Sequence, residues 1–330
     1  MTLLAAFIAC AAVILWTGAR LSRYGDVIAV RTGLGGAWIG LVLLATVTSL
    51  PELVTGMSAV MLFDLPDIAA GDAIGSCMFN LLILALLDVQ DPKPLTARIH
   101  QGHVLAAGFG VAQLGLLGLA LAAGERAPHV GWIGLQSLVS LAVYALAART
   151  IFIYERGRRA EVAEERAVAH ASLITLRAAV WRYAANAVGL AAAAILLPEL
   201  AARLSDASGL GRTFVGTLLV AATTSLPEVV VSIASMRIGA LDMAAANLFG
   251  SNLFNVAVVG LDDLAFRRGP LLEHVSGEHQ LSVMAALIMT GIAIVGLTFR
   301  ASRKRYRLSW DTFAIVGVYV VTIALMARST

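Results

Sequence analysis

The sequence predicts an all-α integral membrane protein with ten transmembrane helices arranged as two inverted five-helix repeats. The 330 residues are 59% hydrophobic and 14% charged, with a mean hydropathy of +0.84, which is too apolar for a water-soluble domain of this size. Apolar segments long enough to cross a membrane recur along the whole chain. In addition, one motif occurs twice, as GLVLLATVTSLPE at 40–52 and GTLLVAATTSLPE at 216–228.

Ten segments are long and apolar enough to cross a hydrocarbon core about 30 Å thick. They are 2–19, 36–62, 67–87, 104–123, 130–153, 184–204, 213–236, 241–266, 280–299 and 310–326. All five tryptophans lie within a few residues of a predicted segment end, where interfacial indoles concentrate: Trp16, Trp38, Trp132, Trp181 and Trp310. Tryptophan placement and hydropathy therefore agree on the boundaries.

The basic residues predict the orientation of the chain. When the connections are assigned alternately to the two sides, 18 of the 24 Lys and Arg fall on one side, so the positive-inside rule predicts both termini outside. The first segment has no basic residue before it and is followed by Arg20 and Arg23, the reverse of a secretory signal, so we expect it to be retained. We therefore expect a multi-pass protein of the cell (inner) membrane whose surroundings are the lipid bilayer. The net charge of +3 comes from these juxtamembrane residues and does not indicate binding of nucleic acid.

A duplication divides the chain. A second block follows each copy of the motif, GDAIGSCMFN at 71–80 and AANLFGSNLFN at 245–255, at an offset of 175 rather than 176 residues. We expect a first five-helix repeat at 1–153, a cytoplasmic linker at 154–177 and a second repeat at 178–330. Because five is odd, the second repeat enters the membrane in the opposite sense, which places a transporter's site at the midplane between the halves.

Each motif carries an acid next to a proline, at Pro51–Glu52 and at Pro227–Glu228. Proline lacks an amide hydrogen and interrupts a helix, so we expect the carbonyls of Val47 and Thr223 to be released. Irregular backbone at membrane depth is tolerated where it lines a cavity or is buried in protein. The two breaks predict a polar cavity between the second, third, seventh and eighth segments.

Oxygen-bearing side chains recur at helical spacing around the two acids. Thr48 and Ser49 share a helix face with Glu52, and Thr224 and Ser225 share one with Glu228. Two stripes at intervals of four residues follow, Asp72, Ser76, Asn80 and Asn247, Ser251, Asn255. Oxygen ligands without His or Cys favour sodium, calcium or magnesium, and two ionised glutamates would neutralise one divalent ion. Cys10 and Cys77 lie in separate segments and are expected to be free thiols rather than zinc ligands.

Structural interpretations of several of these residues stay open. Asp72 has Asn247 as its counterpart, so it is either a member of the site or a partner for nearby backbone. Ser76 and Ser251 are either site residues or bond their own helix. The small residues at intervals of four, Gly71 and Gly75 in the first half with Ala246 and Gly250 in the second, predict close helix contact.

The duplicated TSLPE motif, with GDAIGSCMFN and AANLFGSNLFN, resembles the paired alpha repeats of the calcium/cation antiporter superfamily, especially the prokaryotic sodium/calcium exchanger branch. The resemblance implies alternating-access exchange of calcium for sodium, by a transporter that is not an enzyme, needs no cofactor and is compatible with a monomer. It implies calcium ligands at Glu52, Glu228, Thr48 and Thr224, and sodium ligands at Ser49, Ser225, Ser76, Ser251, Asn80 and the carbonyls of Ala45 and Ala221.

Two departures from that family leave the ion stoichiometry open. Asn255 stands where many exchangers of the branch carry an acid, and Cys77 stands where asparagine is usual. Calcium/proton exchange through the same glutamates is the nearest alternative, and a cation channel with a ring of carboxylates is a further one. All six histidines fall in predicted connections, and no HExxH motif supports an intramembrane hydrolase.

Overall fold

The computed structural model describes residues 2–31, 47–91, 93–156, 174–301, 304 and 308–329, and this part of the chain is almost entirely helical. Eight of its helices are long and apolar enough to cross a membrane, or nine if one bent pair counts as a single span. The prediction of an all-helical membrane chain is confirmed. Of the predicted span 36–62, only the part from residue 47 lies within the described residues.

The helices and strands follow in chain order. They are α1 (Thr2–Arg31), α3 (Leu50–Ser58), a π-helical turn (Ala59–Phe63), α4 (Pro66–Gln90), α5 (Leu95–Arg98), α6 (His103–Ala123), a 3₁₀ turn (Gly124–Arg126), β1 (His129–Val130), β2 (Ile133–Gly134), α7 (Leu135–Arg156), α9 (Leu176–Ser208), α10 (Arg212–Val215), a second π-helical turn (Gly216–Val220), α11 (Ala221–Thr224), α12 (Leu226–Arg237), α13 (Leu241–Ala265), a 3₁₀ turn (Leu271–Glu273), α14 (His279–Phe299) and α15 (Trp310–Ser329).

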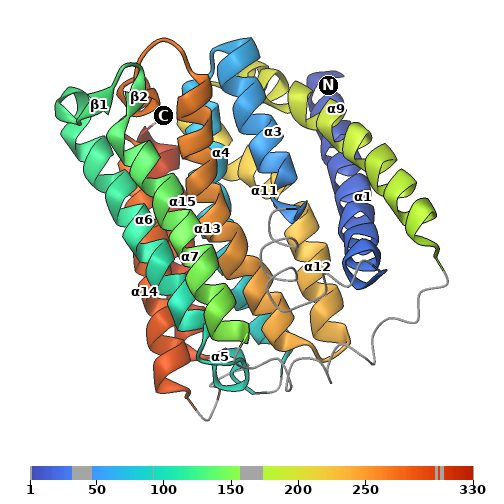
Figure 1. Ribbon diagram of the computed structural model, residues 1–330. Helices are drawn as coiled ribbons and strands as arrows, with labels where there is room; N and C mark the ends of the chain where they lie inside the picture. The colour runs from blue at the N-terminus through green and yellow to red at the C-terminus, as the bar shows by residue number, and fades with distance from the viewer. Residues whose placement is uncertain are drawn as a thin grey trace.

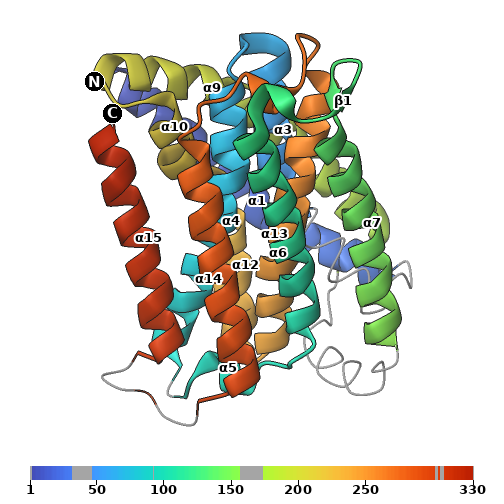
Figure 2. The same ribbon diagram turned by 90° about the vertical axis from the view of Figure 1, so that its left-hand side faces the viewer.

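The long helices α4 and α13 pack against each other in the middle of the bundle (Figure 1). Helices α1 and α9 lie side by side on one flank, and α6, α7, α14 and α15 form the opposite side. Figure 2 shows α15, α14, α6 and α7 from that side. Both ends of the chain lie at the same end of the bundle in both views.

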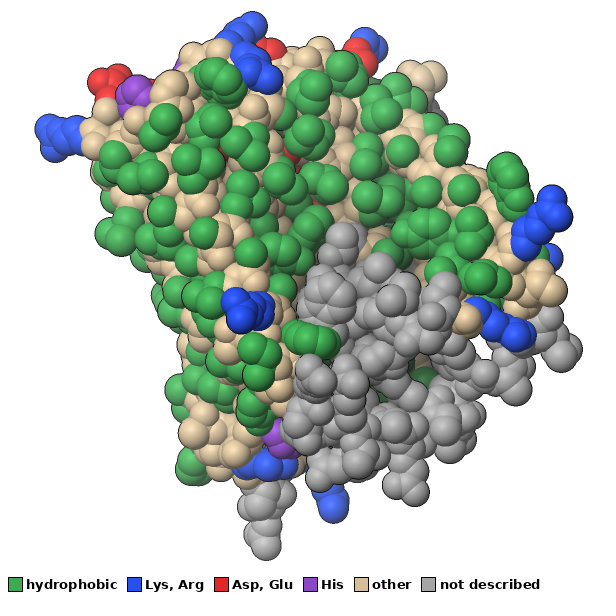
Figure 3. Space-filling model, viewed as in Figure 1, with side chains coloured by type: hydrophobic (Ala, Val, Ile, Leu, Met, Phe, Trp, Pro, Cys, Tyr) green, Lys and Arg blue, Asp and Glu red, His purple; other side chains and the backbone are tan. Residues whose placement is uncertain are grey.

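The outer surface is suited to lipid. Hydrophobic side chains are spread over the described surface in Figure 3, and most of the charged ones lie at its upper rim and edges. Large exposed apolar residues include Leu119, Phe299 and Phe313, each 70% exposed. A soluble protein rarely exposes a continuous apolar surface of this extent, so the lipid bilayer accounts for it.

Several predicted boundaries differ from the observed ones, and the segment predicted at 2–19 continues as a helix to Arg31. The segment predicted to start at residue 130 begins its helix at Leu135, because His129–Val130 and Ile133–Gly134 pair as a short antiparallel hairpin. Gly131 turns this hairpin with φ of 64°, a conformation that glycine adopts readily. The helix predicted at 184–204 runs from Leu176 to Ser208, because backbone hydrogen bonding continues beyond the apolar window.

Both TSLPE motifs interrupt a helix at the serine. Ser49 and Ser225 have nearly the same backbone angles, φ −88°, ψ 15° and φ −82°, ψ 8°, and the next helices begin at Leu50 and Leu226. In each copy the proline then occupies the first turn of the new helix, where its missing amide hydrogen costs nothing. In the second copy the axes on either side of the break differ by 44°. The chain therefore breaks two residues before each proline, in the middle of the bundle.

Small residues allow α4 to lie directly on the π-helical turn of the other half. A Cβ atom at Gly75 would collide with the carbonyl oxygen of Thr217 and lie 2.7 Å from its Cα. At Gly71 it would lie 3.0 Å from the Thr217 nitrogen and 3.1 Å from Gly216. The close contact predicted from the small-residue spacing is thus observed for α4, and it places Ser76 next to the break at Ser225.

Two aspartate–histidine pairs tie the halves together at the starts of the central helices. Asp67, near the start of α4, lies 3.2 Å from His279 Nε2 and accepts the Ser276 amide at 2.6 Å. Asp242, near the start of α13, lies 3.0 Å from His103 Nε2 and accepts the His100 amide at 2.6 Å. Each half therefore contributes the aspartate of one pair and the histidine of the other.

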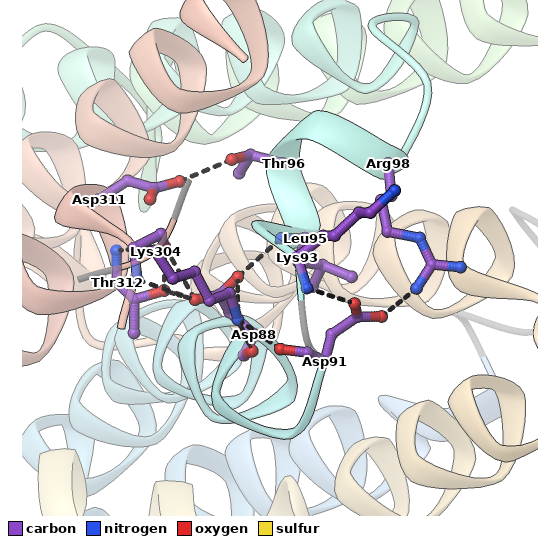
Figure 4. Close-up of polar contacts among 10 residues, drawn as sticks. Asp88, Asp91, Lys93, Leu95, Thr96, Arg98, Lys304, Asp311 and Thr312 are labelled. Atoms are coloured by element: carbon purple, nitrogen blue, oxygen red, sulfur yellow. Dashed lines mark hydrogen bonds and ion pairs between the residues drawn. The ribbon is translucent and has the colours of Figure 1, made fainter. Parts of the chain in front are cut away.

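Matching aspartates also close the far ends of the central helices. Asp88 of α4 accepts the Leu95 amide at 2.6 Å, and Asp263 of α13 accepts the Leu271 amide at 2.6 Å. Figure 4 shows Asp88 meeting Lys304, whose Nζ lies 3.0 Å from Oδ1, and Thr312, whose hydroxyl donates to Oδ2 at 2.7 Å. These contacts anchor the end of α4 to the start of α15.

The contact at Gly75 generates a stability prediction. We expect Gly75→Ala to lower the free energy of unfolding by about 1–3 kcal/mol, because the added methyl overpacks the backbone of Thr217. Gly110→Ala on α6 is the matched control, since a Cβ there meets nothing within 4 Å, and it should be neutral or slightly stabilising. Thermal unfolding of the purified protein in detergent measures both. Equal melting temperatures for the two variants would contradict the close contact.

Candidate functional site

Two glutamates meet in the middle of the bundle, on the helices that follow the two breaks. Glu52 in α3 and Glu228 in α12 have no exposed surface. Within the described chain, neither forms an ion pair with a basic side chain. In each, one carboxylate oxygen accepts hydrogen bonds, and the other, Oε2, has no partner among the described residues.

Each glutamate is held by the serine of the opposite half. The Ser49 hydroxyl donates to Glu228 Oε1 at 3.0 Å, and the Ser225 hydroxyl donates to Glu52 Oε1 at 2.9 Å. Ser251 of α13 also donates to Glu228 Oε1, at 3.2 Å. Because each serine stands at a helix break, the same local conformation that interrupts the helix aims the hydroxyl across the interface.

Two threonines also donate hydrogen bonds to residues of the opposite half. Thr224 donates to Asp72 Oδ1 at 2.7 Å, and Thr48 donates to Asn247 Oδ1, the equivalent atom of the other half, at 3.2 Å. The partner of the Asp72 side chain is therefore a hydroxyl across the interface rather than nearby backbone. Asp72 Oδ2 remains buried without a partner.

The stripe serines join the same network. Ser76 Oγ lies 3.0 Å from Ser225 Oγ and 3.5 Å from Thr224 Oγ1, and Ser251 Oγ lies 3.4 Å from Thr48 Oγ1. The interpretation that these serines bond only their own helix is therefore wrong for both. Each reaches a residue of a neighbouring helix.

An amide layer lies beyond the serines and is not symmetric. Asn80 donates to Asn252 Oδ1 at 3.0 Å, and Asn252 donates to the Cys77 carbonyl at 3.1 Å. Cys77 occupies the position equivalent to Asn252 in the repeat, so Asn255, the equivalent of Asn80, has no amide opposite it. Both polar atoms of the Asn255 side chain are buried, and neither has a partner in the described part of the chain. The sequence analysis predicted Asn80 and Asn255 as site residues but not Asn252. The repeat offset could have identified Asn252, because it is the equivalent of Cys77 in the second half.

The structure places nearly all the residues expected from the sequence in one buried region, and within the described chain Asn255 is the member whose side chain makes no hydrogen bond. Thr48, Ser49, Glu52, Asp72, Ser76, Asn80, Thr224, Ser225, Glu228, Ser251 and Asn255 are each at most 1% exposed. The Ala221 carbonyl, also expected, accepts the Thr224 hydroxyl at 3.2 Å and the Ser225 amide at 3.1 Å. Ala45 lies outside the described residues.

The network offers oxygens to a cation. Its unpartnered buried oxygens are Glu52 Oε2, Glu228 Oε2, Asp72 Oδ2, Asn80 Oδ1 and Asn255 Oδ1. An uncompensated buried carboxylate is costly, and a hard cation would supply both the charge and the missing partners. Over the part of the chain that the structure describes, no three His, Cys, Asp or Glu side chains cluster as a metal group. Neutral oxygens would therefore make up much of the coordination of a bound cation, which suits an ion that must be released after transport.

An apolar helical bundle with acids, hydroxyls and amides gathered between broken helices defines a membrane cation transporter. A sequence profile described as "Sodium/calcium exchanger protein" matches residues 2–153 and 178–328. This chain belongs to the sodium/calcium exchanger family.

Relatives and a solved structure resemble this chain. Inner membrane protein YrbG of Escherichia coli is 27% identical over 255 residues, 74% of each chain. A proposed antiporter, CaxA of Alkalimonas amylolytica, is 27% identical over 305 residues, 88% of each chain. The structure of the sodium-calcium exchanger NCX_Mj soaked with 10 mM Na⁺ and zero Ca²⁺ matches with a TM-score of 0.62 over 98% of both chains, at 20% identity. That likeness shows a shared fold.

The unpartnered oxygen of Asp72 generates a binding prediction. We expect Asp72→Asn to weaken calcium binding about tenfold, or about 1.4 kcal/mol, because it removes a buried charge while Oδ1 can still accept from Thr224. Asp64→Asn is the matched control, since it makes the same charge change at a side chain that is 45% exposed and paired with Arg268. Equilibrium binding of radioactive calcium to the purified protein measures both. Unchanged affinity in Asp72→Asn would make Asp72 structural.

Proposed function

We propose that this protein is a secondary antiporter that exchanges calcium for sodium across the membrane by alternating access. One observation carries the proposal: two fully buried glutamates, each held by a serine of the opposite half, each with a free oxygen and neither with a basic partner among the described residues. Such a pair suits one divalent ion or several monovalent ions in alternation. The NCX_Mj structures, obtained from soaks that include Na⁺ and Ca²⁺, belong to a protein of the same fold and favour these two ions.

The proposed ligands are those that the family resemblance implies, together with Asp72 and Asn255 from the two polar stripes. Calcium would take Glu52 and Glu228, with oxygens of Thr48 and Thr224. Sodium ions would use the same glutamates with Ser49, Ser225, Ser76, Ser251, Asn80, Asn255, Asp72 and the carbonyls of Ala45 and Ala221. Since both ions need the glutamates, the two occupancies would exclude each other, and this exclusion couples their movements.

The proposed architecture is two inverted five-helix halves at 1–153 and 178–330, joined by a cytoplasmic linker at 154–177, with both termini outside. The paired breaks at Ser49 and Ser225, and the hydrogen bonds exchanged across them, support it. Rocking of one half against the other would expose the acids to each side in turn. The likeness to YrbG supports placement in a bacterial-type inner membrane.

Energetics favour three or more sodium ions per calcium under ordinary gradients. Expelling one calcium against an assumed gradient of about 10⁴ and about 100 mV costs about 10 kcal/mol. One sodium ion entering down an assumed gradient of about tenfold releases about 3.7 kcal/mol at the same potential. Two would fall short of this requirement and three would meet it.

Calcium uptake into proteoliposomes tests the proposal. We expect an outward sodium gradient to drive uptake, and a pH gradient without sodium to drive little. We expect Glu52→Gln and Glu228→Gln each to abolish uptake, because each removes a charge that the ion requires. Glu199→Gln is the matched control, since that side chain is 38% exposed and paired with Arg203.

The outcomes separate the alternatives. Uptake driven by a pH gradient but not by sodium would replace sodium with protons as the counter-ion. Unitary currents without a need for a counter-ion would indicate a channel. Wild-type uptake by either glutamate variant would contradict the assignment of that residue.

A further inference from the structure

Another buried acid, Asp262 in α13, takes no part in the network around Glu52 and Glu228. Its side chain has no exposed surface, and neither of its carboxylate oxygens has a hydrogen-bond partner among the described residues. Its neighbour Asp263 is also fully buried but accepts the Gly134 amide at 2.8 Å and the Leu271 amide at 2.6 Å. Asp263 is therefore a structural residue that ties two backbone segments together. Asp262 makes no such hydrogen bonds within the described chain.

Asp262 lies against the bare backbone of α3. A Cβ at Gly56 would collide with Asp262 Oδ2 and lie 2.8 Å from Oδ1. Gly56 is one helical turn beyond Glu52 on α3, and Asp262 is two turns beyond Asn255 on α13. Since α3 and α13 pack together, the carboxylate lies along the same helix faces as the central site, displaced toward the end of the bundle where α3 runs into its π-helical turn.

The charges around Asp262 make its ionised form expensive. Asp72 on α4 and Asp263 are close enough to repel it electrostatically. Among the side chains that the structure describes, the other ionisable groups on elements packed against α13 are Glu52 on α3, Asp67, Cys77 and Asp88 on α4, His103 on α6, which pairs with Asp242, Tyr144, Arg149 and Tyr154 on α7, Glu228 and Arg237 on α12, and Glu273 in the 3₁₀ turn. No basic side chain of the described chain forms an ion pair with Asp262.

We propose that Asp262 is a second cation position on the transport path, which binds one monovalent cation, a sodium ion or a proton, between the central site and the end of the bundle where α3 and α13 terminate. This inference rests on the proposed function, because it places Asp262 on the path of the transported ions. A buried carboxylate with two vacant oxygens and only acids for charged neighbours is stabilised by a cation and destabilised without one.

The position of Asp262 fits the asymmetry of the amide layer. The equivalent residue in the first half is Leu87, so the acid is present in one half only. The polar stripe of α13 runs from Asn247 through Ser251 and Asn255 and continues at Asp262 two turns later. A monovalent ion at Asp262 would add one charge to the transport cycle without competing with calcium for Glu52 and Glu228.

Two neutral variants and one control test the proposal in the full-length protein. Asp262→Asn preserves shape, and Asp262→Leu copies the residue at the equivalent position of the other half. Asp263→Asn makes the same charge change one residue away, at a carboxylate that serves as a structural tie. The melting temperature of each purified protein is followed without calcium, in a sodium titration at fixed pH and in a pH titration without sodium.

We expect the Asp262 variants to lose a cation-dependent rise in melting temperature that wild type and Asp263→Asn retain. If the ion is sodium, the loss appears in the sodium titration, and the Hill coefficient of sodium-driven calcium release falls by about one. If it is a proton, the loss appears in the pH titration, and the sodium Hill coefficient is unchanged. In both arms calcium binding stays within about twofold of wild type.

Other results would overturn the proposal. Sodium and pH responses equal to those of wild type would leave Asp262 without a cation. Failure of both neutral variants to fold would make the carboxylate structural. Failure of the proposed function would look different, because wild-type liposomes would then show no sodium-driven calcium uptake, while the calcium-free melting curves would still report on Asp262.

Discussion

The burial of carboxylates without basic partners is the constraint on which the rest of this structure depends. An ionised acid in an apolar interior is tolerated only if hydrogen bonds and a counter-charge replace water. Here, within the described chain, the hydrogen bonds come from serine and threonine hydroxyls, and the basic residues lie elsewhere. In the proposed function these groups form part of a coordination shell, and a mobile ion supplies the positive charge.

The backbone creates this shell through two features of the repeated motif. The break at each serine turns a hydroxyl out of its own helix, and the following proline starts a new helix without loss of a hydrogen bond. Glycines at 71 and 75 then bring α4 against the π-helical turn before the second break, so that hydroxyls on different helices come within 3.0 to 3.5 Å of one another. Close helix packing and ion chemistry thus depend on the same few residues.

Sequence alone predicts much of this arrangement, because hydropathy, a duplicated motif and helical spacing are local properties. They identify the membrane helices, the two acids and the faces that carry the hydroxyls. They do not identify partners: that Thr224 meets Asp72, that Asn80 pairs with Asn252, or that His103 and His279, which the sequence places in connections, pair with aspartates of the opposite half. Those pairings require two distant segments to be placed together. The helix start at Leu135 was missed because the hairpin before it is as apolar as a membrane segment.

The amide layer couples two positions that are far apart in the chain. With a cysteine at 77, the asparagine at 255 loses the neighbour that its counterpart at 80 retains. The effect of a substitution at one of these positions therefore depends on which residue occupies the other. An asparagine at 77 would offer residue 255 a facing amide, as Asn252 does for Asn80, whereas cysteine at 77 offers none.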